Sequence, residues 1–295
     1  MKTKNDLKLY WPQITIGSVL IIFLILFGVF DLAIAKSFTT YENWFSIGFD
    51  MWGKQAVVIP IGITAMFGIV SIYNIANKTK THIIEPSLIG LSIVIVGTIA
   101  FHSIGYKNFI IVDGDLKSLI TTIATSIIFS ITILSFIATT IMINKLSVFR
   151  DSQYISTLWI KVIYALVLLT ITTLIVTVFK EIWGRPRPNS VIDGTNEFKY
   201  LFEFNFESDR GKSFPSGHTQ AAGMFFLLIY FIPKSSKQTY FKIIFLLISV
   251  CSILLTGISR IVYHKHFPSD VTFSMLLVGV FYTFGPKIVN SILKK

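Results

Sequence analysis

Long runs of apolar residues constrain this chain more than any other feature of its sequence. About eight stretches contain few charged side chains, and about 20 apolar residues in a helix cross the roughly 30 Å hydrocarbon core of a bilayer. We therefore expect an all-α, polytopic transmembrane helical bundle. The expected spans are Ile14–Ala33, Gln55–Ile75, Ile83–Phe101, Leu119–Ile143, Thr157–Phe179, Thr219–Ile232, Tyr240–Ile258 and Val271–Leu293.

The composition supports a membrane protein and argues against a nucleic-acid partner. Only 14% of the 295 residues are charged, whereas a soluble domain usually carries about 25%. The net charge is +11, but the basic residues are scattered between apolar runs and form no stripe that would follow a nucleic-acid backbone. The single cysteine, Cys251, lies in an apolar run, and we expect it to be a small buried hydrophobic residue.

The lysine and arginine residues predict how the spans are oriented. Every second connection is basic, beginning with the N-terminal segment, and short basic connections favour the cytoplasmic side of a membrane. We therefore expect both termini in the cytoplasm, with residues 180–218 and 259–270 together on the outer face. The basic segments contain Lys2, Lys4, Lys8, Lys78, Lys80, Lys145, Arg150, Lys234, Lys237, Lys294 and Lys295.

Two segments near the N-terminus have simple interpretations. Residues 33–35 read Ala-Ile-Ala, as at a signal-peptide cleavage site, but the preceding apolar run is longer than the usual 7–15 residues. We therefore expect the first span to be an uncleaved anchor. Residues 41–52 are rich in aromatic side chains, and we expect them to form an interfacial segment without a chemical role.

Residues 259–270, SRIVYHKHFPSD, concentrate ionisable groups beside the last apolar run. Such groups near a membrane indicate a functional site. His266 and Asp270 are four residues apart, so one helical face can carry both, and a carboxylate can orient an imidazole ring. Arg260 can donate to phosphate or carboxylate oxygens. In a purely structural interpretation, Asp270 would stabilise a helix N-terminus and Arg260 would anchor at the membrane surface.

Two other stretches expected on the same face indicate a phosphate-binding pocket. KEIWGRPRP supplies three cations, although the positive-inside rule disfavours cations at this position. SFPSGHT supplies a histidine and small residues at the start of a span, where free backbone N–H groups can bind an anion. The residues in question are Lys180, Arg185, Arg187, Ser216, Gly217 and His218. Cations, amides and two histidines on one face predict phosphoryl chemistry.

The spacing of these residues resembles a known family pattern. The three parts are Lys180 with Arg187-Pro188, Pro215 to His218, and Ser259-Arg260 with His266 and Asp270. They resemble the signature of the type 2 phosphatidic acid phosphatase (PAP2) family, which shares its site with vanadium haloperoxidases, without a departure at any defining position. The resemblance implies a six-helix PAP2-type core over residues 111–295. Residues 1–110 would form additional N-terminal transmembrane helices.

The resemblance also implies a role for each motif residue. His266 would attack phosphorus and form a phosphohistidine, and Asp270 would orient it. His218 would act as the general acid and later as the general base. The remaining motif residues would bind phosphate oxygens, and neither a metal nor another cofactor is implied. These phosphate-binding residues are Lys180, Arg187, Ser216, Gly217 through its amide, and Arg260.

Other ionisable residues receive simpler interpretations. We expect Arg185 to be a solvated loop charge, with contact to a lipid headgroup as the less favoured alternative. His264 and His266 form a His-x-His pair that suggests zinc, but no further ligand cluster has zinc spacing. We expect His82 and His102 to be interfacial or packed residues.

These features favour an integral membrane enzyme that removes phosphate from a lipid at the outer face of a bacterial cytoplasmic membrane. Phosphatidic acid, phosphatidylglycerophosphate, isoprenyl pyrophosphate and lipid A phosphates all remain open as substrates. A lipid phosphotransferase would use the same residues. An anion transporter is less favoured because the apolar runs are nearly free of polar residues at mid-membrane depth, with Glu85 the main exception. The sequence predicts no oligomeric state.

Overall fold

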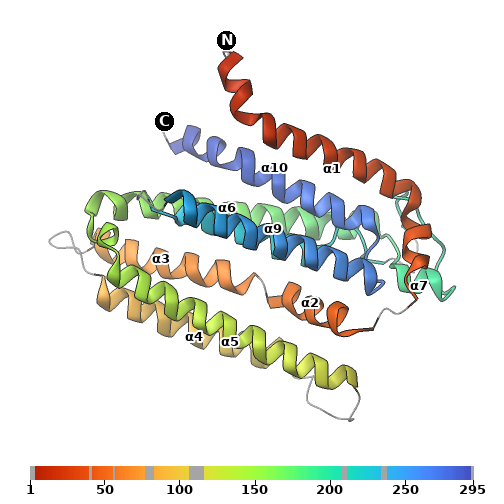
Figure 1. The fold of residues 1–295 in the computed structure, drawn as a ribbon, viewed down its shortest axis with the longest axis horizontal. Coiled ribbons are helices and arrows are strands. Elements are labelled where there is room, and N and C mark those ends of the chain that lie inside the picture. The colour runs from red at the N-terminus through yellow and green to blue at the C-terminus, as the bar shows by residue number, and fades with distance from the viewer. Residues whose placement is uncertain are drawn as a thin grey trace. The chain divides into compact units, whose positions relative to one another are not determined.

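The computed structural model describes residues 4–39, 42–55, 57–76, 83–105, 116–206, 211–233 and 238–293. Within these ranges every regular element is a helix, which confirms the all-α expectation (Figure 1). The elements are α1 (Lys4–Ser37), α2 (Trp44–Gln55), α3 (Val58–Ala76), α4 (Ile84–Gly105), α5 (Leu116–Lys145), η1 (Ser147–Arg150), α6 (Ser152–Trp183), α7 (Pro188–Ile192), α8 (Gly217–Gly223), η2 (Met224–Phe231), α9 (Gln238–Val262) and α10 (Pro268–Leu293).

Six helical segments within the described ranges are long and apolar enough to cross a membrane, not eight. The expected span at Thr219–Ile232 corresponds to the short helices α8 and η2, whereas Val271–Leu293 lies within α10, of which Pro268–Phe284 counts as a shorter apolar helix. In the first of these, α8 passes directly into the 3₁₀ helix η2, which rises about 2.0 Å per residue instead of 1.5 Å. The six longer segments are Ile14–Ser37, Trp44–Ala76, Ile84–His102, Lys117–Lys145, Ser152–Ile192 and Gln238–Val262.

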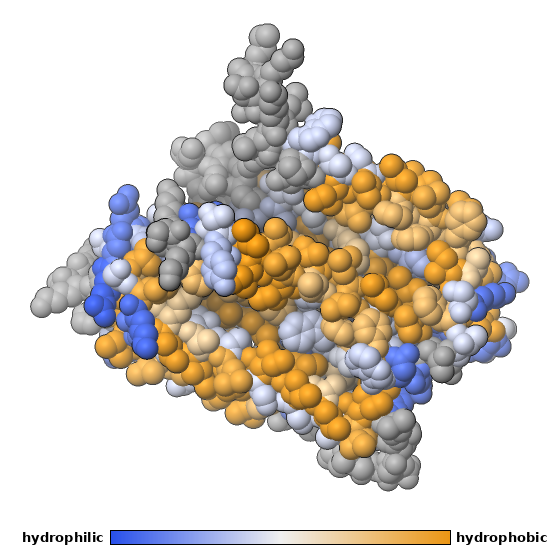
Figure 2. Space-filling model, in the orientation of Figure 1, coloured by the Kyte–Doolittle hydropathy of each residue, from blue (hydrophilic) through white to orange (hydrophobic). Residues whose placement is uncertain are grey.

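The surface of the protein is largely apolar, as expected for a chain in contact with lipid. Isoleucine, leucine, valine and phenylalanine side chains are exposed along most of the long helices, and Figure 2 shows hydrophobic residues covering broad continuous areas. Soluble monomers rarely expose apolar patches larger than a few hundred Å². Cys251 is among the exposed residues, so the expectation that it is buried is wrong.

The chain divides into two compact units, each built from several segments. The first contains Met1–Asp50, Thr170–Gly223 and Ile253–Lys295, and the second contains Met51–Leu169 and Met224–Ser252. All eight residues of the predicted site lie in the first unit. The proposed boundary between residues 110 and 111 falls outside the described residues, so that division of the chain stays a prediction.

In the first unit, α10 packs along α1 and against α8 (Figure 1). Small residues allow the helices around α10 to approach closely, as is common in membrane bundles. A Cβ atom placed on Gly257 in α9 would lie 2.6 Å from Val271 Cγ1 and 2.7 Å from Met275 Cε, both on α10. This close approach sets the position of the first turns of α10, which carry part of the predicted site.

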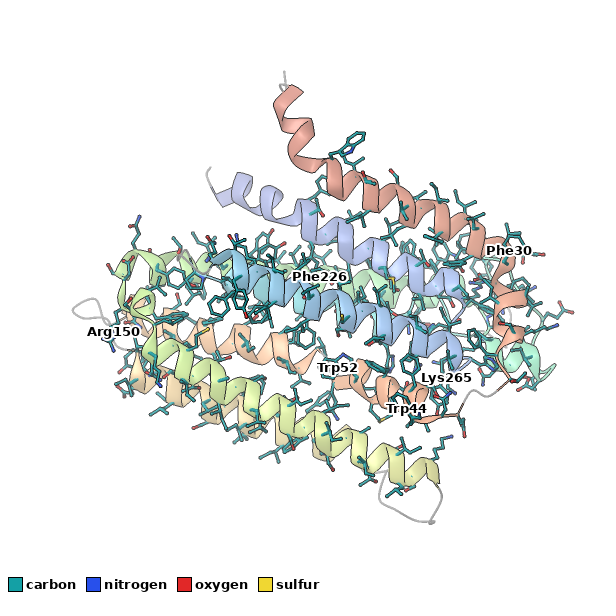
Figure 3. All side chains as sticks on the ribbon, viewed as in Figure 1. Phe30, Trp44, Trp52, Arg150, Phe226 and Lys265 are labelled. Atoms are coloured by element: carbon teal, nitrogen blue, oxygen red, sulfur yellow. The ribbon has the colours of Figure 1, made fainter. Side chains whose placement is uncertain are left out.

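In the second unit, α3 packs against α4 and α5 (Figure 1). The Phe67 ring lies between Phe149 and Phe231, with centroid distances of 5.7 and 4.8 Å. The Trp52 side chain (Figure 3) donates to Ser252 Oγ at 2.7 Å. Residues 44–52 are thus part of helix α2, and their interfacial location stays a prediction.

Gly257→Ala should lower the thermal stability of the protein. The added methyl group would force α9 and α10 apart or displace the Val271 and Met275 side chains, and overpacking of this kind costs about 1–3 kcal/mol. The measurement is the midpoint of thermal unfolding in detergent.

Gly279→Ala is the matched control, because a Cβ atom at Gly279 would meet nothing within 4 Å. It should leave the midpoint unchanged or raise it, since alanine is favoured over glycine in a helix by about 1 kcal/mol. Equal midpoints for the two variants would contradict the close approach.

Candidate active site

The loop after α6 begins at a glycine with a left-handed backbone. Gly184 has φ +57° and donates its N–H to Lys180 O at 3.3 Å, a common way to end a helix. Lys180 therefore lies in the last turn of α6. The same loop pairs with residues 211–213, because Gly211 N–H donates to Gly184 O at 2.9 Å and Ser213 N–H donates to Arg185 O at 3.0 Å. The first two motifs are thus joined by backbone hydrogen bonds.

Asp270 links the start of α10 to the second motif. Pro268 is the first residue of α10, where its missing N–H costs no helical hydrogen bond, and the Asp270 carboxylate accepts from Phe267 N–H at 2.9 Å. The same Oδ2 atom accepts from Ser213 Oγ at 2.5 Å. Asp270 O accepts from Ser216 N–H at 3.3 Å. The two loops expected on one face are therefore in direct contact.

The tautomer of His266 follows from its hydrogen bond. Nδ1 lies 2.5 Å from the carbonyl oxygen of Ser213, and a carbonyl oxygen can only accept, so Nδ1 carries the proton. In a neutral ring this leaves Nε2 unprotonated and able to act as a nucleophile or a base. Asp270 Oδ2 lies 3.8 Å from Nδ1, which is too long for a hydrogen bond. Asp270 therefore acts on the ring as a nearby charge and by binding Ser213.

Burial keeps His266 uncharged. Removal of the ring from water lowers its pKa to about 3, and the positive charges of Arg260 and Lys180 act in the same direction, whereas Asp270 opposes them. The side chain is 1% exposed. At neutral pH the ring is thus the free base, which is the form that a nucleophile requires.

The other predicted residues lie around the same region of the first unit. A Cβ atom on Gly217 would lie 3.5 Å from Lys180 Nζ, so this lysine is next to the start of α8. Arg260 is buried in the last turn of α9. His218 is half-buried in the first turn of α8. Arg187 precedes α7 and is half-buried.

Ser216 and Asp50 complete the surroundings of these residues. Ser216 is fully buried, and its hydroxyl lies 2.8 Å from Thr219 Oγ1. Asp50 in α2 contacts the Arg260 guanidinium, and its Oδ1 lies 3.6 Å from His218 Nε2. Residues from α2, α6, α8, α9 and the start of α10 thus contribute to one polar cluster.

Comparison with known proteins agrees with this arrangement. Residues 161–292, which contain all three motifs, match the model of the PAP2 superfamily. This segment of the chain is therefore similar to the PAP2 superfamily. The PAP2 segment begins within α6 and ends within α10. It therefore leaves out α1 and α2, which supply Asp31 and Asp50.

Two curated relatives of this chain are named lipid A 4'-phosphatase. The protein from Rhizobium etli is 33% identical over 106 residues, which is 35% of this chain and 39% of that protein. The protein from Rhizobium leguminosarum is 31% identical over 119 residues, or 40% of this chain and 49% of that protein. The chain thus spans less than half the length of either relative. No solved structure matches it.

Arg185 is not a solvated loop charge, and that expectation is wrong. Its side chain is 0% exposed, and its guanidinium pairs with Asp270 Oδ1 at 2.7 Å and Asp31 Oδ2 at 2.8 Å. Sequence reasoning missed both Asp31 and Asp50. The available signal was an acidic residue within an otherwise apolar helical run, which is rare unless the residue has a partner or a function.

The remaining described histidines, His102 and His264, are packed within the protein. His102 packs against the Phe129 ring at a centroid distance of 5.0 Å, as expected for a packed residue. His264 is buried, with its ring close to the carbonyl groups of Ala35 and Phe38. In the part of the chain that the structure describes, no group of three or more His, Cys, Asp or Glu side chains could hold a metal ion. His82 lies outside the described residues.

The ring of His266 should not titrate between pH 8 and pH 5. The pKa of His266 in the folded protein is about 3, below the value of about 6.5 in the unfolded chain. The neutral ring therefore contributes to stability above pH 6.5, and this contribution decreases as the pH falls and the unfolded chain takes up a proton. The measurement is NMR of protein labelled with ¹³C at histidine Cε1, with His266→Ala used to assign the signal. A midpoint within this range would contradict the burial argument.

Proposed function

We propose that this chain is an integral membrane phosphatase that hydrolyses a phosphomonoester or pyrophosphate of a lipid through a phosphohistidine intermediate. The observation that carries the proposal is the state of His266. A buried neutral imidazole donates Nδ1–H to the Ser213 carbonyl, so Nε2 has a lone pair available for phosphorus. The similarity of residues 161–292 to the PAP2 superfamily and the names of the two relatives support the same reaction.

In the first step, His266 Nε2 would attack phosphorus and form an N–P bond while the bond from phosphorus to the lipid oxygen breaks. His218 would donate a proton to the departing alkoxide. The charge on the imidazole ring increases as the bond forms. The Ser213 carbonyl at Nδ1 and the Asp270 carboxylate 3.8 Å from that atom would stabilise this positive charge.

In the second step, His218 would accept a proton from water, whose oxygen attacks phosphorus. The N–P bond breaks, inorganic phosphate leaves and His266 returns to its neutral form. Lys180, Arg187 and Arg260 would neutralise the negative charge of the phosphoryl oxygens in both steps. The Ser216 hydroxyl and the Gly217 amide would complete the oxygen-binding groups.

A lipid substrate is supported by the apolar surface of the helices and by the relatives' names. The motif residues bind phosphate and not the lipid tail, so we propose lipid A phosphates as the first class to test. Phosphatidic acid, phosphatidylglycerophosphate and isoprenyl pyrophosphate follow. Transfer of the phosphoryl group to a second lipid would differ only in the acceptor that replaces water.

We also propose a location in a bacterial cytoplasmic membrane, with both termini in the cytoplasm and the site facing outward. The distribution of lysine and arginine supports this orientation. The contact between the loops at 180–218 and 259–270 supports their being on one side of the membrane, because Ser213 hydrogen-bonds both His266 and Asp270.

His266→Ala should abolish release of phosphate from a panel of lipid phosphates in detergent micelles. His218→Ala should lower the rate about 100- to 10,000-fold, the usual contribution of a general acid. This loss should be smaller than the loss caused by His266→Ala. His102→Ala is the matched control, because His102 packs against Phe129 and belongs to no motif. Retention of activity within about tenfold of the parent by His266→Ala would show that the nucleophile is a different residue.

Excess chelator should leave the rate of phosphate release unchanged. In the proposed mechanism, histidine supplies the nucleophile, and lysine and arginine supply the positive charge, so no step depends on a metal ion. The measurement is phosphate release in EDTA, followed by addition of Zn²⁺. Loss of activity in EDTA and recovery with zinc would instead favour the His264–His266 pair as metal ligands.

A further inference from the structure

Asp31 is a buried carboxylate in a helix that lies outside the PAP2 segment. It belongs to the apolar window Ile14–Ser37 of α1 and is 0% exposed. Burial of an ionised carboxylate is expensive unless hydrogen bonds and charges compensate it. The partners of Asp31 therefore indicate why α1 carries this charge.

All described partners of Asp31 donate hydrogen bonds to it. Oδ1 accepts from Ser269 N–H at 2.9 Å, and Oδ2 accepts from Arg185 Nη2 at 2.8 Å and from the Ser269 hydroxyl. Ser269 is the second residue of α10, so its N–H has no acceptor within the helix. Asp31 thus supplies to α10 both a cap for its N-terminus and a negative charge.

Arg185 connects Asp31 to the proposed catalytic residues. Its Nη1 atom donates to Asp270 Oδ1 at 2.7 Å and to Ser269 Oγ at 2.9 Å, and Nε donates to Lys199 O at 3.0 Å. The guanidinium also lies over the Phe267 ring, 4.4 Å from its centroid. A guanidinium with this many fixed contacts has little freedom to move, so its carboxylate partners are fixed as well.

The chain of contacts ends at His266. Asp270 uses Oδ1 for Arg185 and Oδ2 for Ser213 Oγ, and Ser213 O accepts the proton on His266 Nδ1. A shift of Asp270 would therefore move both the charge 3.8 Å from the ring and the carbonyl that sets its tautomer. These contacts are all buried, so water does not readily replace a lost partner.

We propose that Asp31 is a positioning residue for phosphoryl transfer, acting through Arg185 and Asp270 on the orientation of His266. The inference rests on the proposed function of this site. It makes α1, which lies outside the matched family segment, a necessary part of the active site. Asp31 and Asp270 share one guanidinium, so loss of the Asp31 carboxylate changes how Arg185 holds Asp270.

The test is Asp31→Asn, which keeps the size of the side chain but removes its charge and replaces an acceptor with a donor. We expect kcat for a lipid phosphate to fall about 10- to 100-fold, as is usual when a group that orients a catalytic ligand is lost. KM should stay within about threefold, because the proposed phosphate-binding residues are untouched. Two controls are Asp193→Asn, an exposed loop residue, and Phe30→Leu, an exposed side chain next to Asp31 in α1 (Figure 3).

A second measurement does not depend on catalysis. In protein labelled with ¹⁵N-histidine, the His266 Nδ1–H resonance should shift in Asp31→Asn and stay unchanged in both controls. A mere loss of folded protein would reduce the intensity of this signal without moving it. If the parent protein releases no phosphate from any lipid, the proposed function fails, and this resonance still decides whether Asp31 positions His266.

Asp31→Glu covers the case in which Asp31→Asn does not fold. It keeps the charge and moves the carboxylate by one methylene group. A lowered kcat with an unchanged KM and a shifted Nδ1–H resonance would support the proposal. The proposal would be overturned if the variant that folds has the kcat of the parent protein and an unchanged His266 Nδ1–H resonance.

Discussion

The pairing of one buried guanidinium with two buried carboxylates determines much of the structure around the site. Removal of one partner from such a group typically costs about 3–5 kcal/mol, because a charge is left without compensation. Arg185 can satisfy both Asp31 and Asp270 only if α1, the loop after α6 and the start of α10 meet at one place. Hydrophobic packing alone would allow these elements to slide along one another, whereas fixed hydrogen-bond distances do not.

Asp270 performs two tasks that sequence reasoning treats as alternatives. Its carboxylate accepts from Phe267 N–H at the start of α10, which is the structural task. The same oxygen accepts from Ser213 Oγ, which holds the carbonyl bonded to His266. The position of the helix and the orientation of the imidazole therefore depend on one side chain. Any loss of activity on its substitution contains a contribution from both.

The parts of the structure that depend on local pattern could be predicted from the sequence. Apolar runs predict the long helices, and motif spacing predicts the contact between residues 213–216 and 266–270. The sequence does not indicate that Arg185 is buried, because its acidic partners lie 85 and 154 residues away along the chain. Which face of a helix is buried also depends on tertiary packing, as the exposed side chain of Cys251 shows. The apolar pattern of residues 224–231 also does not indicate that η2 is a 3₁₀ helix.

The position of Asp31 has a consequence for biosynthesis. During translation α1 reaches the bilayer before its partners exist, because Arg185 and Ser269 follow 154 and 238 residues later. Asp31 lies near the C-terminal end of the apolar window Ile14–Ser37, where an unpaired carboxylate costs less than the roughly 2.5–3.5 kcal/mol of a helix centre, and the apolar side chains of α1 must outweigh that cost. The hydrogen bonds of Asp31 can therefore form only after the start of α10 has been synthesised.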